Sequence, residues 1–345
     1  MNLSDSTLSK TSPPIETRVG RADRTESIHR AVAVAISLND APMFFGEDPG
    51  TFMRSVAKPF QTLALFRNGV VDHHGLSPEE IAVISASHGG EREHRRRVEG
   101  LLRRGGFTLK DLHCGTHAPF TASERRRMIA GGEKPDLLCN NCSGKHAGML
   151  LHAAHLGADS TRYLDRQHPV QRAVASTLSM FLDVDLSQAD CGIDGCGAPT
   201  WFVSLEAMAR GFARLSDQRF LEERGLVDAV DRYHDALRTA PLLFSGEQRF
   251  PYLWSHHLQP ESFSKEGAEG VYVVWGTRGA LALKSTDGTE RGYRYAIPEL
   301  LSKLGWIDGR THRRWIASDP PIVRNVAGRE VGQIEVSIPE PRMGA

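Results

Sequence analysis

The stretch VYVVWGTRGALALK, residues 271–284, decides the fold class of this chain. Two short apolar runs, 271–275 and 280–284, lie on either side of GTRG, whose terminal residues are glycines. This pattern predicts a β-hairpin. Two further strands are predicted far from it in the sequence: the apolar run AVAVAISL (31–38) as a buried strand, and GQIEVSI (332–338) as a final one.

The segments between these strands are expected to be largely helical. Apolar residues recur at spacings of three and four over 56–70, 163–183, 201–215 and 226–238. Strands from both ends of the chain with helices between them predict an α+β fold rather than a doubly wound βαβ array. We expect an antiparallel sheet flanked by helices, with a helical section inserted, and a single catalytic domain over residues 17–345.

Composition sets limits on the function. The chain of 345 residues has 42 basic and 42 acidic side chains, which gives no support for general binding to nucleic acids or membrane surfaces. No apolar run is long enough to span a membrane, and residues 1–16 are polar and lack the apolar core of a signal peptide. We expect residues 1–16 to form a flexible arm on a cytoplasmic protein. In a reducing compartment, five cysteines indicate free, catalytic or metal-bound thiols.

Lysine is rare, since it accounts for only eight of the 42 basic residues. Unlike arginine, a buried lysine can become a neutral base. In RSVAKPFQ (54–61), Ser55 and Lys58 are three residues apart and would share one helix face. A neutral amine there can take the proton of the serine hydroxyl. The spacing recurs at Ser262 and Lys265, so it is a weak signal alone, and a helix cap at Ser55 is the alternative.

A second serine stands in SASHGGEREH (85–94), which follows the apolar run IAVI (81–84). We interpret this region as a strand running into a tight turn, with Ser87 either as a reactive serine or as a cap. Lys265 comes just before the first strand of the hairpin. It can lean into a cleft at the sheet edge, or it can face solvent.

The segment CNNCSGKHAGM (139–149) is the third candidate. It is not a phosphate loop, because a cysteine stands where that motif needs glycine and a histidine follows the lysine. A closed four-cysteine zinc site with the cysteines of DCGIDGCGAP (190–199) would leave Lys145 without a role. A thioredoxin-like redox pair lacks the surrounding βαβ unit. The segment CGTHAPF (114–120) offers Cys114 and His117 as further ligands or as packing residues.

An open metal site remains. One cysteine from each segment and a nearby group would hold zinc and leave a position for water or substrate. In this arrangement Asp194, which stands two residues before Cys196, orients a substrate amine or a bound water.

Seven motifs now occur in order along the chain: RSVAKPFQ (54–61), SHGGE (87–91), CGTHAP (114–119), NNCSGKHAGML (140–150), DGCGAP (194–199), KEGAEGVY (265–272) and ALKSTDG (282–288). Together they resemble the asparaginase II family of bacteria and fungi, the type of the inducible asparaginase of Rhizobium etli. The resemblance extends over about residues 26–336.

The resemblance implies a fold similar to serine β-lactamases and penicillin-binding proteins, usually in a homodimer. It implies hydrolysis of L-asparagine to L-aspartate and ammonia. It also implies two serine–lysine tandems, which fall on Ser55 with Lys58 and on Ser87 with Lys265. Which serine is the nucleophile stays open.

The resemblance further implies one zinc ion per chain that assists substrate binding. Its ligands fall on Cys142, Lys145 and Cys196, and Cys139 is left to packing. The substrate-binding residues fall on Arg54, Asp194 and His146. Lysine is an unusual zinc ligand, and the metal would itself force its deprotonation.

One segment departs from the family pattern. SGEQRFPYLWSHH (245–257) keeps Arg249 but is bulkier than the usual segment and lacks its threonine. We therefore expect a different pocket wall here, and the choice between asparagine, glutamine and other amides stays open. Two rival functions also remain. One is a hydrolase of β-lactams or peptides, for which KEG (265–267) is a partial strand motif. The other is a zinc-stabilised, non-enzymatic module.

Overall fold

The computed structural model describes residues 12–38, 40–247, 249–258 and 262–344. Of the predicted N-terminal arm, residues 1–11 lie outside the described residues. The end of the predicted arm is part of the fold, because strand β1 begins at Ile15 and Ser12 Oγ donates a hydrogen bond to the Glu340 carbonyl at 2.8 Å.

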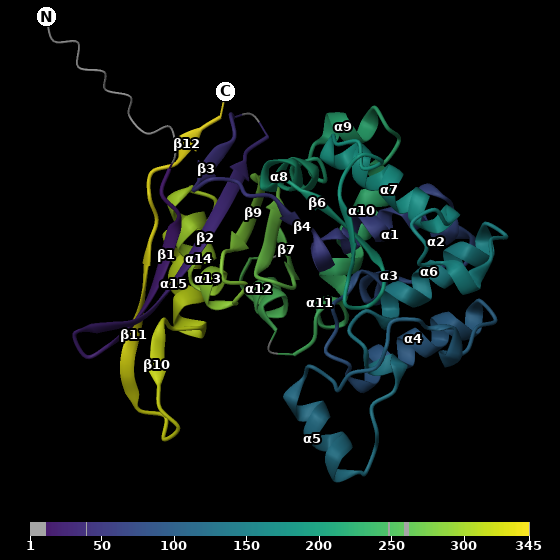
Figure 1. Cartoon of the computed structure of the whole chain (residues 1–345), viewed down its shortest axis with the longest axis horizontal. Helices are drawn as coiled ribbons and strands as arrows, with labels where there is room; N and C mark the ends of the chain where they lie inside the picture. Colours follow the sequence, from purple (N-terminus) through teal and green to yellow (C-terminus); the bar gives the residue numbers. More distant parts are fainter. Residues whose placement is uncertain (1–11, 39, 248, 259–261, 345) are drawn as a thin grey trace, which may run out of the picture.

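An antiparallel sheet lies beside the larger group of helices, and helices pack on both of its faces (Figure 1). In spatial order it consists of β10 (Ile322–Arg324), β11 (Glu330–Ser337), β1 (Ile15–Arg21), β2 (Arg24–Ile36), β9 (Gly279–Ser285), β8 (Val271–Gly276) and β7 (Ser262–Gly267), with β3 (Met43–Phe45) on β2 and β12 (Arg342–Met343) on β3. Strands from both ends of the chain lie side by side in it. The α+β prediction is confirmed.

The predicted hairpin is present as β8 and β9, with Gly276 opposite Gly279. Gly279 has a φ of +127°, and a Cβ built on it would lie 2.1 Å from the Ile36 carbonyl oxygen. Only glycine fits this position, where the hairpin meets the end of β2. From Ala31 to Ile36, β2 pairs with β9, so the strand predicted over 31–38 lies in the middle of the sheet.

Each face of the sheet packs on its own core. One face, with Ala31 and Ala33 of β2, packs against α12 and against the helices that follow the hairpin. These helices are α12 (Phe250–Leu258), α13 (Arg291–Arg294), α14 (Ala296–Lys303) and α15 (Gly309–Ser318). The other face, with Val32 and Val34, packs against the inserted helical section.

The helical section comprises α1 (Lys58–Arg67), α2 (Val70–His73), α3 (Pro78–Ser85), α4 (Arg92–Arg104), α5 (Ala122–Ala130), α6 (Ser143–His155), α7 (Pro169–Leu182), α8 (Leu205–Ala213), α9 (Gln218–Glu222), α10 (Val227–Thr239) and α11 (Pro241–Phe244). The helices predicted over 56–70 and 163–183 are confirmed as the shorter α1 and α7, and the one predicted over 226–238 as α10, displaced by one residue.

Two local predictions are wrong. The run 81–84 is helical, within α3, because Ser77 and Glu80 form a reciprocal capping box with Pro78 in the first turn. The segment 201–215 begins as strand β6 and becomes helical only after Ser204, whose side chain caps α8. A three-stranded sheet, β4 (Thr51–Phe52), β6 (Pro199–Val203) and β5 (Cys191–Ile193), carries the DGCGAP motif in the loop from β5 to β6.

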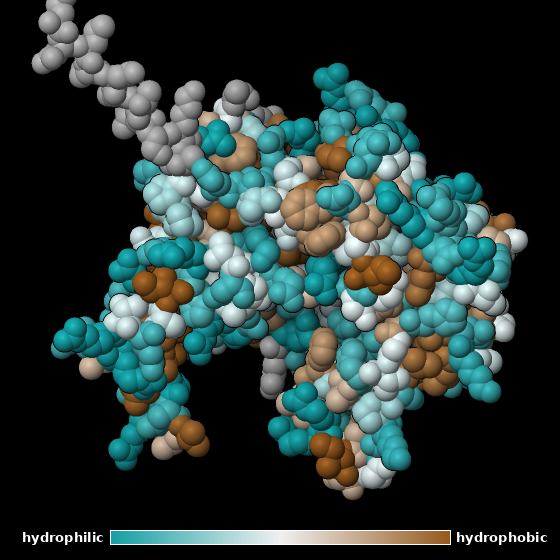
Figure 2. All heavy atoms as spheres, in the orientation of Figure 1, coloured by the Kyte–Doolittle hydropathy of each residue, from teal (hydrophilic) through white to brown (hydrophobic). Residues whose placement is uncertain are grey.

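Hydrophilic side chains dominate the face shown in Figure 2, with hydrophobic residues scattered over it. Within the described part of the chain, none of the helices has both the length and the apolar composition that crossing a bilayer requires.

Candidate active site

A cleft of about 350 Å³ lies where the edge strand β7 meets the helical section, and both candidate serines line it. The strand comes close to the turn before α1 because Gly267 has no side chain: a Cβ there would lie 3.3 Å from the Met53 carbonyl oxygen. The remaining lining residues are Phe120, Asn141, Arg249, Glu266, Gly267, Ala268, Glu269, Gly270, Gly288, Glu290 and Tyr293.

Ser55 lies in a 3-10 turn, Arg54–Ala57, directly before α1. Arg54 adopts a left-handed conformation with a φ of +51°, which is strained for a residue with a side chain. Its N–H donates to Thr200 Oγ1 at 3.0 Å, which ties the turn to β6. Ser55 is half-buried, and among the described residues its hydroxyl has no hydrogen-bond partner. The hydroxyl is therefore free to meet a ligand in the cleft.

Ser87 follows α3 and is 3% exposed. Lys58 Nζ lies 3.0 Å and Lys265 Nζ 2.9 Å from Ser87 Oγ. The structure thus brings Ser87 and Lys265 together, as expected. Lys58, expected beside Ser55, instead donates to Ser87 and to the carbonyls of Ala86 at 2.5 Å and Asn141 at 3.5 Å.

Both lysines are buried, at 1% exposed each. Burial lowers the pKa of Lys58, and burial together with the nearby Lys58 and Arg249 lowers the pKa of Lys265 well below its ordinary value. Desolvation penalises the ammonium form, so each amine loses its proton more readily than an exposed lysine does. A neutral amine has the lone pair that a serine proton needs.

Cys142, Lys145 and Cys196 form a second buried cluster, which we call the Cys–Lys cluster. Cys142 immediately precedes α6, and Lys145 lies in its first turn. Lys145 Nζ donates to Cys196 Sγ at 2.9 Å. Cys139 is fully buried and takes no part in this hydrogen bond.

The charges in the Cys–Lys cluster are distributed unevenly. A hydrogen bond from Cys142 and the charge of Lys145 lower the pKa of Cys196 to about 4, although burial opposes the shift. The same hydrogen bond and burial raise the pKa of Cys142 to about 12. Burial lowers the pKa of Lys145, but Cys196 and Cys142 outweigh it, so that pKa is raised. Cys196 is thus a thiolate held between two donors.

The Cys–Lys cluster presents two sulfurs and one nitrogen toward one another. A thiolate is a strong zinc ligand, and three protein donors suit a zinc site with an open position. The donor set therefore fits zinc once Lys145 and Cys142 lose their protons. Among the described residues, no group of three or more His, Cys, Asp or Glu side chains is arranged to hold a metal ion, so a four-cysteine site is not formed.

The three residues expected to bind substrate do not lie together. Arg54 and Asp194 contact each other, whereas His146 is buried elsewhere. Arg54 Nε donates to Asp194 Oδ1 at 2.8 Å, which connects the turn of Ser55 to the loop of Cys196. His146 is fully buried and lies outside the cleft lining. Its Nδ1 pairs with the Tyr163 hydroxyl at 2.7 Å, and burial holds its pKa well below the usual range.

The glycines of CNNCSGKHAGM serve helix packing. A Cβ at Gly144 would lie 2.2 Å from the Val83 carbonyl oxygen, and one at Gly148 would lie 2.9 Å from Ile84 Cγ2. Helix α6 therefore touches the backbone of α3. This contact sets Lys145 close to the end of α3, where Ser87 follows.

The loop residues beside the cleft have supporting roles. His117 Nε2 accepts from the Asn141 N–H at 3.0 Å, and Cys114 Sγ contacts the Leu137 carbonyl at 3.8 Å. The bulky residues of SGEQRFPYLWSHH do not fill the cleft: Phe250 and Trp254 pack in the core under α12–α15. Of this segment, Arg249 lines the cleft.

Sequence reasoning did not assign a role in the site to several cleft residues. They are Phe120, Asn141, Arg249, Glu266, Glu290 and Tyr293. The sequence did offer a signal for Glu266, because it directly follows the candidate base Lys265 in the KEG motif (265–267). Tyr293 comes from helix α13 and the others from loops, and the approach of all of them to the cleft depends on tertiary packing.

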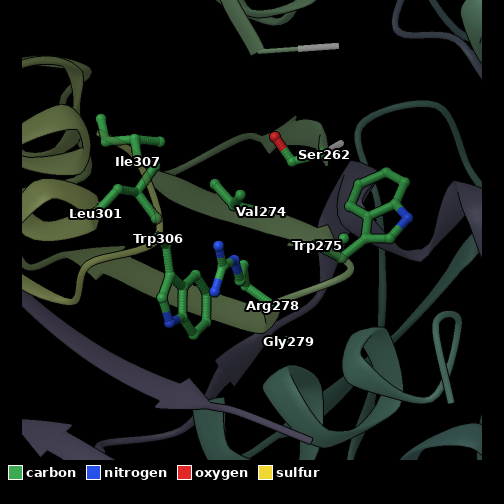
Figure 3. Close-up of a pocket in the computed structure, with 9 residues that line it drawn as sticks. Ser262, Val274, Trp275, Arg278, Gly279, Leu301, Trp306 and Ile307 are labelled. Atoms are coloured by element: carbon green, nitrogen blue, oxygen red, sulfur yellow. The ribbon is translucent and has the colours of Figure 1, made fainter. Parts of the chain in front are cut away.

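A separate small pocket of about 40 Å³ lies beside the hairpin, between the sheet and Trp306 (Figure 3). None of the candidate catalytic residues lines it. The indole of Trp275 points away from the other labelled side chains in this view. We assign this pocket no role in catalysis.

Comparison with known proteins agrees with the motifs. The model of a family described as L-asparaginase II matches residues 17–336, which is most of the chain. A search of curated proteins returned no match.

Proposed function

The chain belongs to the L-asparaginase II family, and from this premise we propose that it hydrolyses the side-chain amide of L-asparagine to give L-aspartate and ammonia. The observation that carries the mechanism is the continuous contact Lys58 Nζ–Ser87 Oγ–Lys265 Nζ, whose serine lines the same cleft as Ser55. A fold of the serine β-lactamase type, a homodimer and a cytoplasmic location belong to the same proposal.

In the first step Ser55 is the nucleophile. Its Oγ forms a bond to the amide carbon, and its proton passes to Lys58, three residues later in the chain, whose amine turns from its contact with Ser87 to receive it. The half-buried position of Ser55 in the cleft and its free hydroxyl support this role. Backbone N–H groups of the turn that opens α1 stabilise the developing oxyanion, an effect of about 3 kcal/mol per donor.

The leaving group needs a proton next. The contact from Lys58 through Ser87 to Lys265 provides a relay, because each neighbouring pair is within hydrogen-bond distance. As the C–N bond breaks, ammonia takes the relayed proton. Water then attacks the Ser55 ester, gives its proton to a neutral lysine, and releases aspartate while Ser55 regains its hydroxyl proton.

Ser87 is the second candidate nucleophile. The specific observation in its favour is that two lysine amines lie within 3.0 Å of its hydroxyl. It is nearly fully buried, however, at 3% exposed, whereas Ser55 is open to the cleft. An incoming carbonyl carbon therefore meets Ser55 with less rearrangement.

Zinc, when bound, would be held by Cys142, Lys145 and Cys196 and would supply fixed positive charge next to the site. The cluster's own residues support this: a buried thiolate, a thiol and an amine with an ion-paired Asp194 close by. Asp194 and Arg54 connect the cluster to the turn of Ser55. Through this connection the cluster would fix the orientation of the substrate.

The test is ammonia release. We expect the purified protein to release ammonia from L-asparagine faster than from L-glutamine. A chromogenic β-lactam is the matched control for the rival hydrolase. Turnover of the β-lactam without ammonia release from asparagine would contradict the proposal.

A further inference from the structure

The catalytic proposal leaves one charged feature of the cleft without a role. Among the described residues that line the cleft, Arg249 is the one cation, and Glu266, Glu269 and Glu290 are the carboxylates. Arg249 forms an ion pair with Glu266 inside the cleft, with side chains 20% and 15% exposed. A mostly buried ion pair facing a cleft presents a positive and a negative group side by side.

The backbone fixes Arg249 relative to Ser87. Gly246, with a φ of +123°, packs so closely on the loop after Ser87 that a Cβ there would lie 3.1 Å from the Gly89 nitrogen. Glu91 Oε1 in that loop accepts from the Glu247 N–H at 3.0 Å and from Thr121 Oγ1 at 2.7 Å. The segment that carries Arg249 is therefore bonded to the segment that carries Ser87.

Glu266 is fixed from the other direction. It follows Lys265 in β7, and Lys265 Nζ donates both to Ser87 Oγ at 2.9 Å and to the Glu266 carbonyl at 3.0 Å. The Arg249 guanidinium also lies over the Phe120 ring, 5.2 Å from its centroid. Arg249 and Glu266 thus both lie on segments that are hydrogen-bonded to Ser87 or to the loop that follows it.

The guanidinium has an unused donor. Arg249 Nε is buried, and among the described residues it has no hydrogen-bond partner. Burial lowers the pKa of Arg249, but an arginine starts from so high a value that it stays charged in proteins. The pKa values of Lys58 and Lys265 are lowered too, and neither lysine lines the cleft. An anion entering the cleft therefore finds Arg249 rather than a lysine. A buried donor without an acceptor is unfavourable until a ligand supplies one.

We propose that the Arg249–Glu266 pair determines specificity by binding the free α-amino acid groups of the substrate. The guanidinium binds the α-carboxylate, a planar group that it recognises with two parallel hydrogen bonds. The α-ammonium lies on Glu266. A zwitterion laid against this ion pair puts each charge beside its opposite, so the pair favours free amino acids with a side-chain amide. An asparagine within a peptide lacks both charges. The inference rests on the proposed function.

The test compares L-asparagine with two amides that each lack one charge. 3-Aminopropanamide lacks only the α-carboxylate, and succinamic acid lacks only the α-ammonium. We expect Arg249→Met to lower the ratio of kcat/KM for L-asparagine to that for 3-aminopropanamide by about 100-fold. Glu266→Gln should lower the corresponding ratio against succinamic acid. Arg249→Lys keeps the charge but not the paired hydrogen bonds, and should lie between wild type and Arg249→Met.

A binding measurement separates the two proposals. We expect isothermal titration to show that the wild type binds L-aspartate more tightly than β-alanine, and that Arg249→Met removes this difference. The exposed Arg103→Met is the matched control. Equal losses of kcat/KM for L-asparagine and 3-aminopropanamide in Arg249→Met would overturn the inference. So would an unchanged preference of this variant for L-aspartate over β-alanine. Failure of the wild type to release ammonia from L-asparagine, with the aspartate preference retained, would instead overturn the proposed activity.

Discussion

At the scale of single residues, the proposed mechanism depends on two lysines whose pKa values burial lowers. Lys58 and Lys265 are each 1% exposed, and the pKa of each is lowered by desolvation. An exposed lysine would be protonated at neutral pH and unable to take a proton. Ser87 lies within hydrogen-bond distance of both amines.

The lowered lysine pKa values predict the pH dependence of activity. The neutral amine is the working form, so activity is present above the folded-state pKa and is lost as pH falls through it. Because burial lowers the pKa of Lys58 and brings that of Lys265 well below its ordinary value, the acid limb of a plot of kcat/KM against pH should lie below 10.5.

The measurement is a pH profile of ammonia release. The matched control is Lys284→Met, which changes a partly buried lysine outside the cleft lining and should leave the profile in place. An acid limb near 10.5, where an exposed lysine titrates, would contradict the assignment of Lys58 and Lys265 as bases.

At the scale of elements, the contact between α3 and α6 positions the two clusters relative to each other. Gly144 brings α6 onto the backbone of α3, so that Lys145 and the end of α3 share one region. Helix α6 is thus both the carrier of the Cys–Lys cluster and the support for the loop of Ser87.

Gly144→Ala should therefore destabilise the protein. The added methyl group would lie 2.2 Å from the Val83 carbonyl oxygen, and overpacking of this kind costs about 1–3 kcal/mol. Urea unfolding measures the change in the free energy of unfolding. Gly100→Ala in α4 is the matched control, because a Cβ there meets nothing within 4 Å and alanine favours a helix. Equal stability of the two variants would show that the α3–α6 contact is not tight.

The sequence predicts some elements better than others for physical reasons. The hairpin 271–284 was predictable because its turn glycines and apolar runs are local signals. The run 81–84 was misassigned because four apolar residues suit either a strand or a helix, and the capping residues before it decided the outcome. The partner of Lys58 was not predictable, since it depends on how α1 and α3 pack rather than on the spacing of Ser55 and Lys58.

At the scale of the whole molecule, two cores on the two faces of one sheet support the site. The core under α12–α15 contains no residue of the Cys–Lys cluster. The fold is thus supported by apolar packing on both faces, and the cleft lies at the sheet edge where the helical section meets β7.

This arrangement predicts how metal removal acts. After dialysis against a chelator, we expect far-UV circular dichroism to be unchanged and the melting temperature to fall by only a few degrees, about 2–4 °C per kcal/mol lost. Substrate affinity should weaken, and added zinc should restore it. Cys196→Ser is the matched variant, because it removes the thiolate. Global unfolding on chelation would instead favour a zinc-stabilised module.

The identity of the serine that carries the acyl group tests the central claim most directly. Rapid quenching of the reaction with L-asparagine, followed by peptide mass spectrometry, locates an aspartyl ester. The account predicts the ester on Ser55 in the wild type, its loss in Ser55→Ala with activity down on the order of 10⁴-fold, and slowed turnover but an intact Ser55 ester in Ser87→Ala. An ester on Ser87, or full activity in Ser55→Ala, would contradict it.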